Sequence, residues 1–143
     1  MSYFNYFKSS EFFPNCTNEE IKQCFESNYF DNLLILFMVL DVFRDCVGSP
    51  IKVTSTYRDY EHNKLVGGSS TSQHLYAAAI DFCMVSMPFK TAQYFLTDFL
   101  QKSALEQYLG QVVFYHKREF FHIGLRTQNH NFLQILHYEQ GNN

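Results

Sequence analysis

The first third of the chain contains two stretches in which apolar residues recur at helical spacing. Thr17, with a glutamate three residues later, forms a capping box that predicts a helix over about residues 18–28. Asp31 should cap a second helix, whose broad apolar face ends at Gly48. The preceding residues 1–16 show no period, so we expect an irregular arm anchored by Phe and Tyr rings.

The middle of the chain changes to patterns typical of strands. Residues 51–57 alternate between apolar and polar side chains, which indicates a half-buried strand. Residues 58–73 are polar and contain two adjacent glycines, so they predict a loop with one helical turn near residues 60–65. Residues 76–84 are small and apolar around Asp81 and predict a buried strand.

The C-terminal part predicts one more helix and a hairpin. Pro88 stands near the start of a third helix that runs to about Lys102, and a short helical piece follows over residues 103–108. Two apolar runs separated by a polar tetrapeptide indicate a β-hairpin, with strands at residues 111–115 and 120–125. The tail should add a last strand or turn at residues 132–138.

These elements predict an α+β fold, with a small antiparallel sheet flanked by about three helices. The 143 residues suit one domain, residues 1–143, which would bury roughly 70% of its unfolded surface. The net charge of −3 and the lack of a long basic run exclude a nucleic-acid footprint. The longest apolar run, residues 33–40, is too short to span a membrane, and we see no secretory signal at the N-terminus. We expect a monomer.

The cysteines do not form a metal-binding pattern. None of the 4 Cys stands in a Cys-x-x-Cys pair, which argues against a thiolate zinc cluster. Without a secretory signal we expect these thiols to be reduced and mostly buried. The 16 Phe and 10 Tyr residues predict an aromatic-rich core and an aromatic-lined groove.

Five polar residues carry the candidate chemistry, namely Arg58, His74, Asp81, Glu119 and His122. Two imidazoles and a carboxylate are sufficient ligands for a zinc ion that keeps its fourth position open to water. Glu119 would take a proton from that water, and Arg58 would stabilise negative charge. Such a set is sufficient for the hydrolysis of an amide bond.

The spacing of these residues is weak evidence by itself, because an odd separation places two residues on opposite faces of one strand. His74 and Asp81 are seven apart, so His74 must belong to the loop before the strand that carries Asp81. Glu119 and His122 are three apart, so we expect Glu119 at the hairpin turn or on a bulge and His122 on the strand.

Each residue also has a purely structural interpretation. A salt bridge to Arg58 would compensate a buried Asp81 without any metal. His122 would then be a hydrogen-bonded core histidine, His74 a loop residue and Glu119 a solvated charge at a turn. A protein without metal and with a fortuitous motif is therefore one interpretation of the residues.

Three motifs combine these residues in a more specific way. Residues 72–81 read Ser-Gln-His-Leu-Tyr-Ala-Ala-Ala-Ile-Asp, residues 55–58 read Ser-Thr-Tyr-Arg, and residues 119–122 read Glu-Phe-Phe-His. Residues 63–68, Asn-Lys-Leu-Val-Gly-Gly, lie between the first two. This combination resembles the zinc D-alanyl-D-alanine carboxypeptidases of peptidoglycan, specifically their compact phage and bacterial domains, and covers most of the chain.

The resemblance implies a role for each of the five residues. His74, Asp81 and His122 would bind Zn²⁺, and Glu119 would act as the general base. Arg58 would bind the developing oxyanion or a substrate carboxylate, since a guanidinium stays charged and forms two parallel hydrogen bonds.

The resemblance also implies a substrate and the residues that line its site. Ser72, Gln73 and Tyr57 would line the site, and a peptidoglycan stem peptide would be cut by a D,D-carboxypeptidase or an endolysin-like endopeptidase. The small size and the lack of a wall-binding module and of a signal suggest a phage-encoded or mobile-element protein, which would act on the cell wall after release from the cytoplasm or from a virion.

Two departures and one alternative function accompany this resemblance. Ala77 and Thr56 replace glycines of the family pattern, which affects the geometry of the loops but removes no ligand. The family's hedgehog relative shows that such a domain can work through interactions. The alternative is therefore a catalytically idle, zinc-stabilised binding module of a phage particle or cell envelope.

Overall fold

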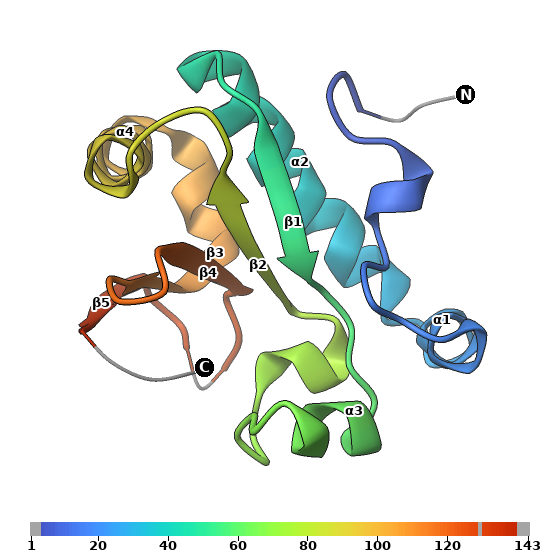
Figure 1. The fold of residues 1–143 in the computed structure, drawn as a ribbon. Helices are drawn as coiled ribbons and strands as arrows, with labels where there is room; N and C mark the ends of the chain where they lie inside the picture. Colours follow the sequence, from blue (N-terminus) through green and yellow to red (C-terminus); the bar gives the residue numbers. More distant parts are fainter. Residues whose placement is uncertain (1–3, 129, 140–143) are drawn as a thin grey trace.

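A five-stranded sheet in the order β1-β2-β4-β3-β5 forms the centre of the computed structural model, which describes residues 4–128 and 130–139 (Figure 1). Its strands are Ile51–Ser55 (β1), Ala79–Met84 (β2), Leu109–Tyr115 (β3), Phe120–Leu125 (β4) and Gln134–Tyr138 (β5). Neighbouring strands are antiparallel except β3 and β5, which are parallel. The α+β class is confirmed, but the sheet is mixed rather than wholly antiparallel.

The direction of β5 follows from the path of the chain after β4. The backbone N–H of Arg126 donates to the carbonyl of Tyr108, 2.8 Å away, so the chain leaves β4 beside the start of β3. It then crosses β3 at Gly110, where an added Cβ would lie 2.6 Å from the carbonyl oxygen of His130. Because β5 begins on the far side of that crossing, it runs in the same direction as β3.

The long helices cover one face of this sheet. The α-helices are Asn18–Glu26 (α1), Phe30–Val47 (α2), Tyr60–Leu65 (α3) and Phe89–Lys102 (α4), and three 3₁₀ helices are Ser9–Glu11 (η1), Gln73–Tyr76 (η2) and Ala104–Tyr108 (η3). Figure 1 shows α2 running behind β1, and α3 beside the end of β1. Alternate strand residues point into the apolar core under α2 and α4, among them Ile80, Phe82, Phe114, Phe121 and Ile123.

The structure corrects three predicted boundaries. Tyr29, not Asp31, precedes α2, because Asn28 in a left-handed conformation (φ 60°) turns the chain directly from α1 into the next helix. The strand expected at residues 76–84 begins only at Ala79, since the residues before it form η2 and a turn. The strand expected at residues 51–57 ends at Ser55.

The other predicted helices and strands are confirmed, including the hairpin of β3 and β4 with Glu119 in its turn. The arm predicted at residues 1–16 contains the short helix η1, and its first three residues lie outside the described residues. No helix within residues 4–128 and 130–139 is long and apolar enough to cross a membrane. The four cysteines are free thiols, but they are less buried than expected, because Cys24 is buried whereas Cys46 is exposed.

The predicted capping box connects α1 to the segment that carries Arg58. Thr17 and Glu20 exchange the two expected bonds, at 3.0 and 3.1 Å. The buried Glu20 carboxylate also accepts the backbone N–H of Asp59 at 3.0 Å and lies 2.9 Å from Nδ1 of His62. Asp59 caps α3, so one carboxylate holds the start of α1 against the start of α3.

We expect Glu20→Ala to lower the free energy of unfolding by about 3 kcal/mol, because it leaves buried N–H donors without an acceptor. Burial raises the pKa of Glu20, but the hydrogen bonds from Asp59, Thr17 and His62 outweigh it, so this pKa is lowered. Ionised Glu20 therefore stabilises the folded protein fully above its unfolded-state pKa of about 4.3, and this contribution is lost as pH falls through the lower pKa of the folded state. Urea unfolding at several pH values measures it.

The exposed neighbour Glu19 supplies the control, since Glu19→Ala should change the free energy of unfolding by less than about 0.5 kcal/mol. Equal effects of the two substitutions would contradict the anchoring role of Glu20.

Candidate metal centre

The three predicted ligands meet on the face of the sheet opposite the helices. His74 lies on η2, Asp81 on β2 and His122 on β4, and all three are at least 95% buried. One potential ligand atom from each lies within 4.8 Å of the others. Oδ1 of Asp81 is 3.2 Å from Nε2 of His74 and 2.8 Å from Nδ1 of His122.

Strand register brings two of these ligands together. Asp81 and His122 are directly opposite each other in the antiparallel pair of β2 and β4, so their side chains leave the same face of the sheet. His74 lies outside the strand, as its odd spacing from Asp81 predicted, and η2 places it over the same point.

A backbone carbonyl orients the His74 ring. Nδ1 of His74 lies 2.6 Å from the carbonyl oxygen of Thr56, and since a carbonyl only accepts, Nδ1 carries the proton. The lone pair of Nε2 then faces Asp81. A histidine that ligates a metal commonly has its second nitrogen held in this way.

The resulting donor set suits a cation. Burial lowers the pKa of His74, although the charge of Asp81 opposes this, so the neutral imidazole is favoured. Burial also opposes ionisation of Asp81, but the two imidazoles outweigh it and hold the pKa of this carboxyl well below its usual range. Because Nδ1 donates to Thr56, Nε2 and Oδ1 are two acceptors 3.2 Å apart, an arrangement that either a proton or a metal ion between them stabilises.

Glu119 and Arg58 border the cluster on one side. Both line a cavity of about 340 Å³ together with Asp81. Glu119 is exposed at the end of the hairpin turn, as predicted, in a left-handed conformation (φ 57°) that only glycine and asparagine adopt readily. The side chain of Glu119 is thereby presented to the cavity from a strained turn.

Arg58 is a buried cation with unused donors. Only 4% of it is exposed, its Nη2 donates a 3.4 Å hydrogen bond to Oγ of Ser72, and its buried Nε has no partner in the described part of the chain. Burial lowers the pKa of this guanidinium, and the charge of Asp81 opposes that shift. The orphaned donor is suited to an anionic or carbonyl ligand.

The residues predicted to line the site occupy different places. Ser72 lines a second cavity of about 390 Å³ on the His122 side, and its Oγ caps η2 by accepting the N–H of His74 at 3.2 Å. Gln73 lines the same cavity, but its amide donates to the carbonyl of Leu125 at 3.0 Å. Tyr57 is not among the residues that line either cavity, because its hydroxyl points to Gln23 of α1.

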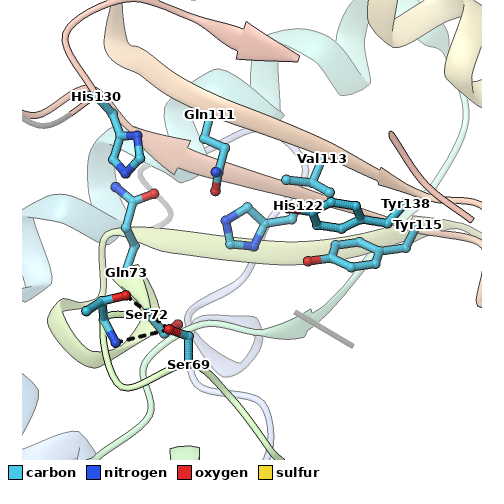
Figure 2. A pocket seen from close by; sticks show the side chains of 10 residues that line it. Ser69, Ser72, Gln73, Gln111, Val113, Tyr115, His122, His130 and Tyr138 are labelled. Atoms are coloured by element: carbon cyan, nitrogen blue, oxygen red, sulfur yellow. Dashed lines mark hydrogen bonds between the residues drawn. The ribbon is translucent and has the colours of Figure 1, made fainter. Parts of the chain in front are cut away.

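The second cavity contains residues that sequence reasoning missed (Figure 2). Gln111, Val113 and Tyr115 of β3 line it with Tyr138 of β5 and His130 of the preceding loop. Side chains alternate between the two faces of a strand, and Val113 is directly opposite His122 in the hairpin. Gln111, Val113 and Tyr115 therefore share the face of the sheet that carries His122, which the hairpin pattern in the sequence could have indicated.

Ala77 lies at a special backbone position. Its φ of 55° and ψ of 25° are left-handed, and its N–H donates to the carbonyl of His74 at 3.2 Å. This is the position at which the family pattern has glycine, and glycine adopts this conformation without strain. The substitution leaves the turn between His74 and β2 intact.

Comparison with known families agrees with this geometry. A model described as Peptidase M15 matches residues 5–124, which include every one of the ligands. The chain belongs to the Peptidase M15 family. Members of this family are zinc peptidases, so the protein is a metallopeptidase by family. A search of curated proteins gave no match.

The matched segment of this M15 peptidase covers most of the fold. It runs from the N-terminal arm through β4, whereas Tyr138 and His130 of the second cavity lie after it. The candidate metal centre thus lies within the family-matched segment, whereas His130 and Tyr138 of the adjoining cavity come from residues beyond it.

We expect His122→Ala to reduce zinc affinity at least 100-fold, because two protein ligands replace three. Elemental analysis and competition with a chromophoric chelator measure stoichiometry and affinity. His130→Ala is the matched control, since His130 lines the cavity beside the cluster without belonging to it. Full zinc occupancy in His122→Ala would exclude His122 as a ligand.

Proposed function

We propose that this M15 peptidase is a zinc enzyme that hydrolyses an amide bond in the stem peptide of peptidoglycan. The observation that carries the proposal is the convergence of His74, Asp81 and His122 within 4.8 Å, with Glu119 and Arg58 at the border of the same cluster. Three of these side chains would bind the metal ion, Glu119 would act as a base, and Arg58 would supply a positive charge beside it.

His74, Asp81 and His122 would hold the zinc ion. Bound zinc supplies Lewis-acid chemistry, in that it polarises a carbonyl group and lowers the pKa of water. The buried position of the three residues excludes bulk solvent, which strengthens electrostatic interactions there.

Glu119 would be the general base that accepts a proton from the attacking water and passes it to the leaving amine. Its conformation supports a functional role. A glutamate held at φ 57° is strained by roughly 1–2 kcal/mol, whereas asparagine or glycine would relieve the strain. An idle binding module would have no reason to keep glutamate at this position.

Arg58 would bind the oxygen on which negative charge develops, or a carboxylate of the substrate. Its unpaired Nε and its position in the same cavity as Glu119 support this role. Ser72 would orient Arg58 through the 3.4 Å hydrogen bond, and Gln73 would fix the cavity wall against β4.

The substrate class is proposed from chemistry. A stem peptide has free carboxylates and small D-residues. These suit a site in which a buried arginine lines a cavity of about 340 Å³ and a second cavity of about 390 Å³ lies on the His122 side. We propose D,D-carboxypeptidase or endopeptidase activity of the endolysin kind, in a phage-encoded protein that acts on the cell wall.

We expect Glu119→Gln to bind one equivalent of zinc yet lose hydrolysis by at least 10³-fold, because the amide cannot accept the proton. The assay digests defined muropeptides and identifies the products by mass. Lys117→Gln, an exposed substitution in the same turn, should keep full activity. Normal turnover in Glu119→Gln would refute the role of Glu119.

Glu119→Asn separates the functional role from a structural one. Because asparagine tolerates the left-handed conformation, this variant should unfold with a free energy about 0.5 kcal/mol higher than the wild type while being inactive. A destabilised Glu119→Asn would mean that the glutamate serves the fold. Zinc-loaded wild type that releases no fragment from any muropeptide would instead favour the idle binding module.

A further inference from the structure

Tyr115 has a buried ring and lines the cavity beside the candidate metal centre. Tyr115 ends β3 and is only 3% exposed, yet it lines the cavity next to His122. Figure 2 shows its hydroxyl directed along the cavity toward the region between His122 and Ser72.

The ring of Tyr115 is held rigidly. It stacks on Phe120, with ring centroids 4.3 Å apart and planes 6° from parallel. The Tyr138 ring packs edge-on against it, with centroids 5.4 Å apart. Because both neighbours restrict the ring, the hydroxyl needs little reorganisation to meet a ligand, which is the condition for electrostatic preorganisation.

The cavity that Tyr115 lines is shared with His122 and adjoins Arg58. Nη2 of Arg58 donates a 3.4 Å hydrogen bond to Oγ of Ser72, and Ser72 lines the same cavity as Tyr115, so the guanidinium lies at the border of that cavity. A phenol ordinarily titrates near pH 10 and is therefore a donor at neutral pH. A developing oxyanion between Arg58 and Tyr115 would accept hydrogen bonds from both side chains.

We propose that the Tyr115 hydroxyl donates a hydrogen bond to the carbonyl oxygen of the scissile amide as negative charge grows on it, beside Arg58. This inference rests on the proposed peptidase function. Tyr115 is then a catalytic residue supplied by β3, distinct from the five residues of the sequence motifs.

The test is Tyr115→Phe, which removes one oxygen and keeps the stacked ring. We expect kcat on a cleaved muropeptide to fall about 100-fold with KM changed less than threefold, because the bond strengthens only in the transition state. Zinc stoichiometry and the midpoint of thermal unfolding should match the wild type. Tyr94→Phe, at an exposed tyrosine of α4 that lines neither cavity, should leave kcat unchanged.

A second readout does not depend on turnover. Calorimetry on the zinc-loaded proteins compares a phosphinate pseudodipeptide, which carries the charged oxygen of the transition state, with the neutral-carbonyl dipeptide D-Ala-D-Ala. Tyr115→Phe should bind the phosphinate at least tenfold more weakly than wild type and the dipeptide with equal affinity.

Three outcomes would overturn the proposal. Unchanged kcat and unchanged phosphinate affinity would remove Tyr115 from the reaction. A raised KM with normal kcat would make Tyr115 a ground-state binding residue. Wild-type protein that neither cleaves muropeptides nor binds the phosphinate would refute the proposed function itself, whereas active wild type with an equally active Tyr115→Phe refutes this inference alone.

Discussion

The compensation of one buried negative charge is the constraint on which the candidate site depends. Asp81 is 4% exposed on a central strand, and an ionised carboxylate there is costly without partners. The sheet supplies His122 by register, and η2 supplies His74, whose ring the Thr56 carbonyl turns toward the carboxylate. The same geometry that compensates the charge also forms a three-ligand set for a cation.

The backbone is strained where it positions this set. Among the described residues, four other than glycine have positive φ, and two of them are asparagines that adopt such conformations readily. The other two are Ala77, which follows η2, and Glu119, which precedes β4. Each lies three residues from a ligand histidine, so the strain is concentrated at the turns that orient the metal centre, as is common at functional sites.

The two faces of the sheet have separate tasks. Residues of β2, β3 and β4 that face α2 and α4 form an apolar core, which fixes the strands in register. The alternate residues, on the opposite face, carry the polar groups of the site. Because these residues share their strands with the core residues, a rigid core also fixes the positions of the candidate ligands. Cavities of about 340 and 390 Å³ border the metal centre, which gives a peptide room on either side of the cluster.

The sequence alone predicted the candidate residues of the site and determined the type of most elements. The Thr17 capping box, the hairpin and the position of Glu119 in its turn followed from local patterns, because capping and turn formation depend on neighbouring residues. Only the tertiary structure decided that β5 runs parallel to β3, that Tyr57 faces α1 and that Tyr115 borders the cluster. These facts depend on how distant segments cross and pair, which no local spacing encodes.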